Sequence, residues 1–181
     1  MIKIGIAIVG LAVAGWYFVM DGSKLDEAMV REFYEKQQHA VLSRNPEALC
    51  KQFASNGVFT TETVMMGQTQ AATLNQKSAC EGTRKTWEMF EAMGNKAGGI
   101  LTIEYDYKID SIELSANKKR ATVVTSNTLK MGEALMQFRT TAAEELVRNY
   151  RVVQLAKSDS KTGVRMTMGA MADPSKFFVE R

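Results

Sequence analysis

Several residue types that build catalytic and metal sites are scarce in this chain. Its 181 residues include one histidine, two cysteines and two prolines. The single histidine, His39, has no partner at the spacing of a metal site, and the cysteines lack the companions that a zinc site requires. No hydrolase elbow is present, and Gly94, Gly98 and Gly99 do not follow a predicted strand, as a phosphate loop would. We therefore expect no metal, no cofactor and no motif-borne catalytic residue.

A strong net charge is also absent. The chain carries 23 basic and 20 acidic residues, which leaves a formal charge of +3. Its only basic triplet is Lys118-Lys119-Arg120, in a predicted hairpin turn, where it is typical of a solvated tip. We expect no nucleic-acid partner.

What the sequence does contain is an uncharged run from Ile4 to Met20. As a helix, this run of about 17 residues would be roughly 25 Å long, near the lower limit for crossing a bilayer. Trp16 and Tyr17 lie where an aromatic belt at the membrane surface is expected. The pattern predicts a single-pass anchor over residues 1–22, followed by one domain over residues 23–181.

The charges beside this run predict its orientation. Lys3 and the α-amine precede it, so the N-terminus is expected in the cytoplasm and the domain in the periplasm, at a bacterial inner membrane. The alternative is a cleaved signal peptide, for which Ala12-Val13-Ala14 offers a cleavage site. Cleavage there would leave the apolar residues 16–20 at the mature N-terminus, so the anchor is the preferred interpretation.

The two cysteines are interpreted with this compartment in mind. Cys50 and Cys80 fall on predicted helices that flank one hairpin. A pair of thiols on the oxidising side of a membrane usually bonds where the geometry allows it. We expect a Cys50 to Cys80 disulfide, the alternative being two buried thiols that never meet.

Helix signals dominate the first half of the predicted domain. Ser23 is the expected N-cap of a helix that ends near Ser43, and Asn45 with Pro46 begins a short second helix. Residues 58–75 read as a pair of short strands, and residues 77–93 as a third helix.

The second half reads as antiparallel strands. Apolar and polar residues alternate from Leu101 to Ile109, and the alternation shifts at Ser111, which predicts a β-bulge. A turn is expected at residues 115–118 and another at residues 158–163. The further strands expected are Arg120 to Met131, Met136 to Lys157 and Val164 to Ala172.

Two adjacent acids lie within the longest of these predicted strands. Glu144 and Glu145 could form a charged edge that prevents strand pairing, or could mark a partner surface.

This order of elements is similar to that of the nuclear transport factor 2-like superfamily, which includes ketosteroid isomerases and SnoaL-like cyclases. Tyr34 followed by Asn45-Pro46-Glu47-Ala48-Leu49 resembles the opening of many such domains. The resemblance covers Leu25 to Ala172. It implies an α+β, cone-shaped domain in which three N-terminal helices pack on a curved antiparallel sheet, here preceded by one transmembrane helix.

In that superfamily the open end of the cone holds an apolar pocket, where enzymes place a carboxylate base and a hydrogen-bond donor. An acid on the same strand face as Tyr105 is missing, because Glu104 and Asp106 point the other way. The residues expected to line the pocket are Tyr34, Trp87, Phe90, Tyr105 and Tyr107.

We therefore expect a membrane-anchored binding protein in preference to an enzyme. Its partner would be another envelope protein, a second copy of the chain or an apolar small molecule. The alternative is an isomerase or cyclase that uses the cone pocket. A carboxylate within hydrogen-bond reach of a pocket tyrosine would favour the enzyme.

Overall fold

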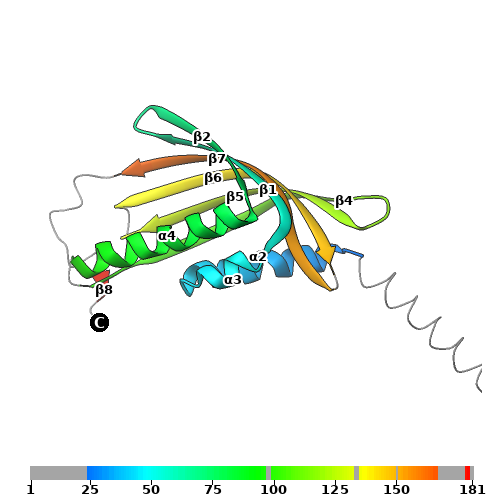
Figure 1. Cartoon of the computed structure of the whole chain (residues 1–181), viewed down its shortest axis with the longest axis horizontal. Coiled ribbons are helices and arrows are strands. Elements are labelled where there is room, and N and C mark those ends of the chain that lie inside the picture. The colour runs from blue at the N-terminus through cyan, green and yellow to red at the C-terminus, as the bar shows by residue number, and fades with distance from the viewer. Residues whose placement is uncertain (1–23, 97–98, 133–134, 150, 167–177, 180–181) are drawn as a thin grey trace, which may run out of the picture.

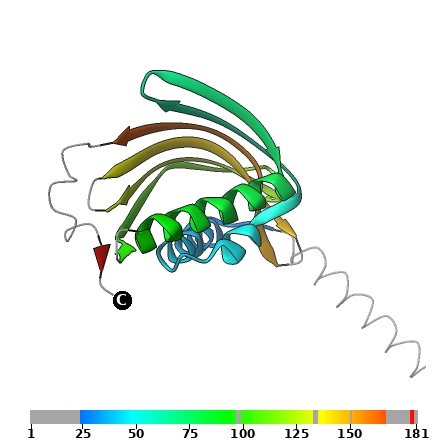
Figure 2. The same cartoon turned by 60° about the vertical axis from the view of Figure 1, so that its left-hand side comes forward.

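The computed structural model of the chain describes residues 24–96, 99–132, 135–149, 151–166 and 178–179. Six strands form one curved sheet in the order β2-β1-β7-β6-β5-β4 (Figure 1). The helices lie on its concave side, as the turned view in Figure 2 shows. The predicted α+β architecture with a curved sheet is confirmed.

Two helices begin where short polar side chains cap them. Helix α2, Glu27–Leu42, starts after Asp26, whose Oδ1 accepts a hydrogen bond from the amide of Met29 at 2.8 Å. Asp26 is thus the N-cap in place of the predicted Ser23, which lies outside the described residues. Helix α3, Pro46–Cys50, is capped by Asn45 as predicted.

Helix α4, Gln76–Lys96, is longer than the predicted helix over residues 77–93. Asn75 and Ser78 bond to each other's backbone amides at its start, which satisfies two of the otherwise unpaired N–H groups. Cys80 in α4 bonds to Cys50 in α3, with the two Cα atoms 5.2 Å apart. The predicted disulfide is confirmed and joins the two helices.

The strands are more numerous than predicted, and their bounds differ. Residues 58–75 form the expected hairpin, but its first strand also pairs in parallel with β7, so the sheet is not wholly antiparallel. The expected bulge is present as a register shift between Ile109 and Ser111. The strands are β1 Phe53–Met65, β2 Gln68–Asn75, β3 Ile100–Leu101, β4 Ile103–Leu114, β5 Arg120–Met131, β6 Met136–Asn149, β7 Val152–Met166 and β8 Phe178–Val179.

The prediction for the last two long strands was wrong. The turn falls near Arg151, which has a φ of 75°, and not at residues 158–163. Those residues lie inside β7, which is paired on both sides, so ladder hydrogen bonds outweigh their turn-like composition. Of the predicted strand over Val164 to Ala172, Val164 to Met166 belong to β7, and residues 167–172 lie outside the described residues.

Two apolar clusters fill the space between sheet and helices. The first contains buried residues of α2 and of the sheet, among them Val30, Val123 and Leu146. The second contains Phe90 of α4 with Leu101, Met131 and Met136, and lies near the other end of the strands. The candidate site lies on the concave face within the first cluster, which includes Tyr34.

No helix among the described residues is long and apolar enough to cross a membrane. The predicted anchor over residues 1–22, including Ile4, Trp16, Tyr17 and Met20, lies outside the described residues.

Candidate functional site

A buried carboxyl group on the concave face forms the centre of the candidate site. Glu144 of β6 is 8% exposed, and the hydroxyl of Tyr34 in α2 donates a hydrogen bond to its Oε2 at 2.6 Å. Tyr34 is 1% exposed. A carboxyl group is rarely buried unless it is hydrogen-bonded, so a buried glutamate is an unusual group in a folded domain. The bond from Tyr34 also joins α2 to the centre of the sheet.

Two hydroxyl groups complete the surroundings of this carboxyl group. Ser158 on β7 donates to Oε1 of Glu144 at 3.5 Å, and Thr125 on β5 also bonds to the side chain. Burial raises the pKa of Glu144 above its ordinary value, and the bonds from Tyr34, Ser158 and Thr125 offset part of this rise. The group can therefore hold a proton at a higher pH than an exposed glutamate.

Three tyrosines surround the same point. The ring of Tyr34 stacks on that of Tyr107, with centroids 5.9 Å apart. Burial and the charge of Glu144 raise the pKa of Tyr34, and the same two causes raise that of Tyr105. Gln38, one turn after Tyr34, donates to the backbone oxygen of Tyr105 at 3.1 Å and so holds α2 against β4.

The sequence-predicted pocket residues divide into two groups. Tyr34, Tyr105 and Tyr107 come together near Glu144, whereas Trp87 and Phe90 form an edge-to-face pair in the second apolar cluster. Those two residues line a cavity of about 340 Å³ between α4 and the segments around Arg44 and Leu101. The single pocket expected from all five residues is therefore not what the structure shows.

The central acid itself was missed by the sequence analysis. The interpretation of Glu144 and Glu145 as a charged edge is wrong, because β6 lies between β5 and β7. Glu144 shares its strand face with Ala142 and Leu146, both buried. The alternation of apolar and polar residues around Glu144 could have predicted that its side chain faces inward. An acid was expected only on the strand that carries Tyr105.

Beyond Glu144 the concave face becomes polar without becoming charged. Strand pairing aligns its inward side chains in rows across the sheet. The first row is Thr125, Ala142, Ser160 and Thr61; the second is Asn127, Thr140, Thr162 and Thr63. We call these two rows the polar band.

On one side of the polar band lies the row that contains Val123, Glu144 and Ser158, and the row beyond it, with Leu146 and Leu155, is apolar. On the other side lie Leu129 and Phe138, which pack on the second cluster. The polar band therefore lies in the middle of the concave face and not at its rim.

The described residues hold no group of three or more His, Cys, Asp or Glu side chains that could bind a metal ion. The chemistry available at the site is that of one carboxyl group, phenol and alcohol hydroxyls, and amides.

Comparison with known proteins finds the fold but no close relative. No family model matches the sequence, and no curated protein matches it. Among solved structures, a conserved protein from Planctomyces limnophilus DSM 3776 is 15% identical with a TM-score of 0.56, over 78% of this chain and 98% of that one. LinA is 13% identical with a TM-score of 0.55, over 78% and 89%.

A ketosteroid isomerase-like protein from Erwinia carotovora atroseptica SCRI1043 matches with a TM-score of 0.51 and 13% identity, over 76% of this chain and 98% of that one. The chain shares their fold. These likenesses agree with the predicted architecture, and at such identities they show the fold alone and nothing of activity.

Proposed function

We propose that this domain is an enzyme that moves a proton within a small molecule bound on the concave face, with Glu144 as the acid-base group. The observation that carries the proposal is the buried hydrogen bond from Tyr34 to Glu144. A carboxylate within hydrogen-bond reach of one of the expected pocket tyrosines favours an enzyme over a passive binding domain. A raised pKa suits this role, because an acid-base group works best when its pKa approaches the working pH.

The chemistry follows from the groups present. Glu144 takes a proton from a carbon beside a carbonyl group: the C–H bond breaks, an O–H bond forms on the carboxyl group, and the electron pair delocalises onto the carbonyl oxygen. Returning the proton to a second carbon gives an isomer, and no oxidant or cofactor is consumed. Tyr34 positions the carboxyl group by holding Oε2.

Proton exchange tests this role without knowledge of the natural substrate. The probes are 2-tetralone and 5-androstene-3,17-dione in D₂O, with loss of the protons beside the carbonyl followed by NMR. We expect wild type to accelerate exchange of at least one probe and Glu144→Gln to lose about a hundredfold or more of that acceleration.

Glu145→Gln is the matched control, since the neighbouring acid faces the other side of the sheet and pairs with Arg120. It is expected to exchange at the wild-type rate. Equal rates for wild type and Glu144→Gln, or no acceleration of either probe by wild type, would contradict the proposal.

The proposed location is the oxidising side of a membrane. The Cys50–Cys80 disulfide is of the kind that persists outside the cytoplasm, and the run from Ile4 to Met20 is of a length that could tether the domain. Membrane fractionation of the full chain, with a membrane-impermeant thiol reagent applied after reduction, tests both points. Recovery in the soluble cytoplasmic fraction with two free thiols would contradict them.

A second candidate function, binding of an envelope protein or of a second copy, is favoured by one observation. Strand β2 lies at an edge of the sheet, contains no charged residue and is almost fully exposed. Such an edge can accept another strand. Crosslinking in intact membranes tests it: a stoichiometric product that disappears in Ala71→Pro supports pairing at β2, and a chain recovered alone contradicts it.

A further inference from the structure

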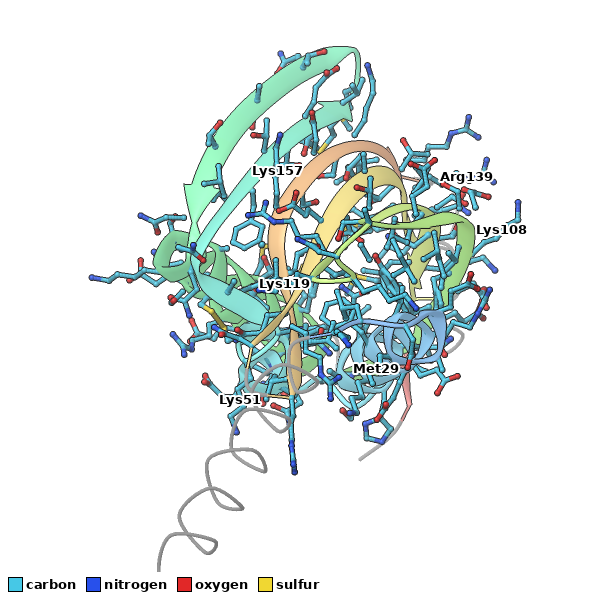
Figure 3. All side chains as sticks on the ribbon, turned by 90° about the vertical axis from the view of Figure 1, so that its right-hand side faces the viewer. Met29, Lys51, Lys108, Lys119, Arg139 and Lys157 are labelled. Atoms are coloured by element: carbon cyan, nitrogen blue, oxygen red, sulfur yellow. A yellow bond between two sulfur atoms is a disulfide. The ribbon has the colours of Figure 1, made fainter. Side chains whose placement is uncertain are left out.

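Two turns at one end of the sheet carry positive charge and no acid. The turn between β4 and β5 contains Lys118 and Lys119, and the turn between β6 and β7 contains Arg151. Both turns lie at the right-hand end of the sheet in Figure 1, and Figure 3 looks onto this end and shows Lys119 near its centre. At the opposite end of the strands, the turn at Met66 and Gly67 has no charged residue.

The first residues that the structure describes lie between these two turns. The amide of Leu25 donates to the backbone oxygen of Lys118 at 2.6 Å, and Nη1 of Arg148, near the end of β6, donates to the backbone oxygen of Lys24 at 2.6 Å. Leu25 is 1% exposed and belongs to the first apolar cluster, so packing also holds this arrangement. The chain therefore enters the domain at the end of the sheet that carries the basic turns.

Five cationic side chains are exposed at this end, and together we call them the basic end: Lys24, Lys118, Lys119, Arg120 and Arg151. Glu145 neutralises part of this charge through its ion pair with Arg120. A local surplus of positive charge attracts anions that lie within about one Debye length, which is about 8 to 10 Å at moderate salt.

The sequence brings the basic end close to the uncharged run from Ile4 to Met20. Lys24 is four residues beyond Met20, so even a fully extended chain separates their Cα atoms by no more than about 14 Å. With that run as the tether proposed above, the distance from the basic end to the membrane surface is comparable with the Debye length. For this proximity the inference below rests on the proposed tether.

We infer that the basic end binds anionic lipid headgroups of the membrane that holds the domain. Lys118 and Lys119 contact the lipid phosphates, and the uncharged turn at the other end of the strands points away from the bilayer. Each cation close to an anionic bilayer strengthens binding about fivefold, so a few cations are enough to hold a tethered domain at the surface. A zwitterionic headgroup has no net charge and does not provide this attraction.

Lysine labelling of the full chain in nanodiscs tests the inference. Nanodiscs of phosphatidylcholine alone are compared with nanodiscs of an equal mixture with phosphatidylglycerol, and acetylation of each lysine by an amine-reactive ester is followed by mass spectrometry. We expect the anionic lipid to slow labelling of Lys118 and Lys119 about threefold or more. Labelling of Lys85 on α4 and of Lys130, at the other end of β5, should stay unchanged. Sodium chloride at about 1 M should abolish the slowing.

A double variant locates the effect on the basic end. Lys118→Asn/Lys119→Gln removes two charges, and asparagine is chosen because Lys118 has a φ of 56°, which asparagine tolerates. In wild type the anionic lipid should also slow labelling of Lys24, and the variant should lose about half or more of this effect. Lys85→Gln/Lys130→Gln is the matched control, since it makes the same change in charge elsewhere and should keep the wild-type effect. Circular dichroism checks that both variants are folded.

Three results in nanodiscs would overturn the inference: equal labelling of Lys118 and Lys119 with and without the anionic lipid, equal slowing at Lys85, or an effect at Lys24 that survives the double variant. Equal protection by a short duplex DNA added to neutral nanodiscs would also overturn it, because it would show a general affinity for polyanions.

Failure of the tether is distinguishable from failure of the basic end. A chain that does not incorporate into neutral nanodiscs contradicts the tether. The basic end is then tested alone by sedimentation with phosphatidylglycerol vesicles, which wild type should bind and Lys118→Asn/Lys119→Gln should not. Absence of wild-type binding, or equal binding of the two proteins, would overturn the inference.

Discussion

The two faces of the curved sheet differ in the number and surroundings of their charged side chains. On the outer face, acidic and basic side chains that lie next to each other form ion pairs in contact with solvent. Figure 3 shows Lys108 and Arg139 on this outer side, away from the helices. These exposed pairs are Lys108 with Asp110, Lys130 with Glu104, Arg120 with Glu145 and Lys161 with Glu62. On the concave side, the described residues of β5, of β6 from Met136 to Leu146 and of β7 present Glu144 alone. Arg148, farther along the same face of β6, donates to the backbone oxygen of Lys24.

Glu144 and Glu145 allow the two faces to be compared directly, because they are consecutive residues of one strand. Each accepts a short hydrogen bond, from Tyr34 at 2.6 Å and from Arg120 at 2.7 Å. Their surroundings differ: solvent screens the outer pair, whereas burial raises the pKa of Glu144. The comparison teaches that environment, and not the length of the bond, decides which of two like residues becomes chemically special.

The largest expected effect comes from placing a charge on each face in turn. Val123 is fully buried and its neighbour Val124 is 40% exposed on the other side. Val123→Lys buries an unpaired ammonium group and is expected to lower the free energy of unfolding by about 4 kcal/mol or more, while Val124→Lys changes it by no more than about 0.5 kcal/mol. Urea unfolding followed by circular dichroism measures both. Similar losses for the two variants would show that the faces do not differ as described.

A smaller effect is expected from removing one partner of each glutamate. Tyr34→Phe deletes the hydroxyl that bonds Glu144 and leaves a buried carboxyl group less satisfied, at a cost of about 1 to 3 kcal/mol. Arg120→Met breaks the exposed pair with Glu145 and costs about 0 to 1 kcal/mol. Unfolding free energies of the two variants test this order. If Arg120→Met cost as much as Tyr34→Phe, burial would not be the deciding factor.

Much of the fold could be predicted from local patterns. Asn45 and Pro46 marked the start of α3, the shift of alternation at Ser111 marked the bulge, and the cysteine positions marked the disulfide. Each of these features is set by a few consecutive residues or by one pairing. The parallel contact of β1 with β7 could not be predicted in this way, since it joins segments about a hundred residues apart.

The candidate site was predicted only in part, for a related reason. Three of the five expected residues, Tyr34, Tyr105 and Tyr107, do meet, but the acid they meet lies on another strand. Glu144 was missed because an acid was expected on the strand that carries Tyr105, whereas pairing of β6 with β5 and β7 brings Glu144 to the tyrosines. The end of β6 was also predicted eight residues too late, at Lys157 instead of Asn149. Ser158 was assigned to a turn for the same reason.

The pH dependence of stability sharpens the comparison further. The pKa of Glu144 in the folded state is raised above its ordinary value near 4.5, so the folded state holds this proton more tightly than the unfolded chain does. The resulting stabilisation is fully present below the ordinary pKa and is lost as pH rises through the raised one. Across this pH range, the free energy of unfolding of wild type should fall relative to that of Glu144→Gln. The fall should be about 1.4 kcal/mol for each unit by which the pKa of Glu144 is raised. Urea unfolding of both proteins from mildly acidic to alkaline pH measures this difference, and a difference that stays constant would contradict the raised pKa.

The smallest expected effect is the response to salt. Raising sodium chloride from about 0.1 M to about 1 M shortens the screening length from about 10 Å to about 3 Å, which weakens exposed pairs far more than buried ones. The loss caused by Arg120→Met, already at most about 1 kcal/mol, should therefore shrink toward zero, because Arg120 is 63% exposed. The loss caused by Tyr34→Phe should stay the same, since the bond to Glu144 is shielded from ions by burial. Unfolding free energies of wild type and both variants at the two salt concentrations check this, and a salt-sensitive Tyr34→Phe difference would mean that solvent reaches the Tyr34–Glu144 contact.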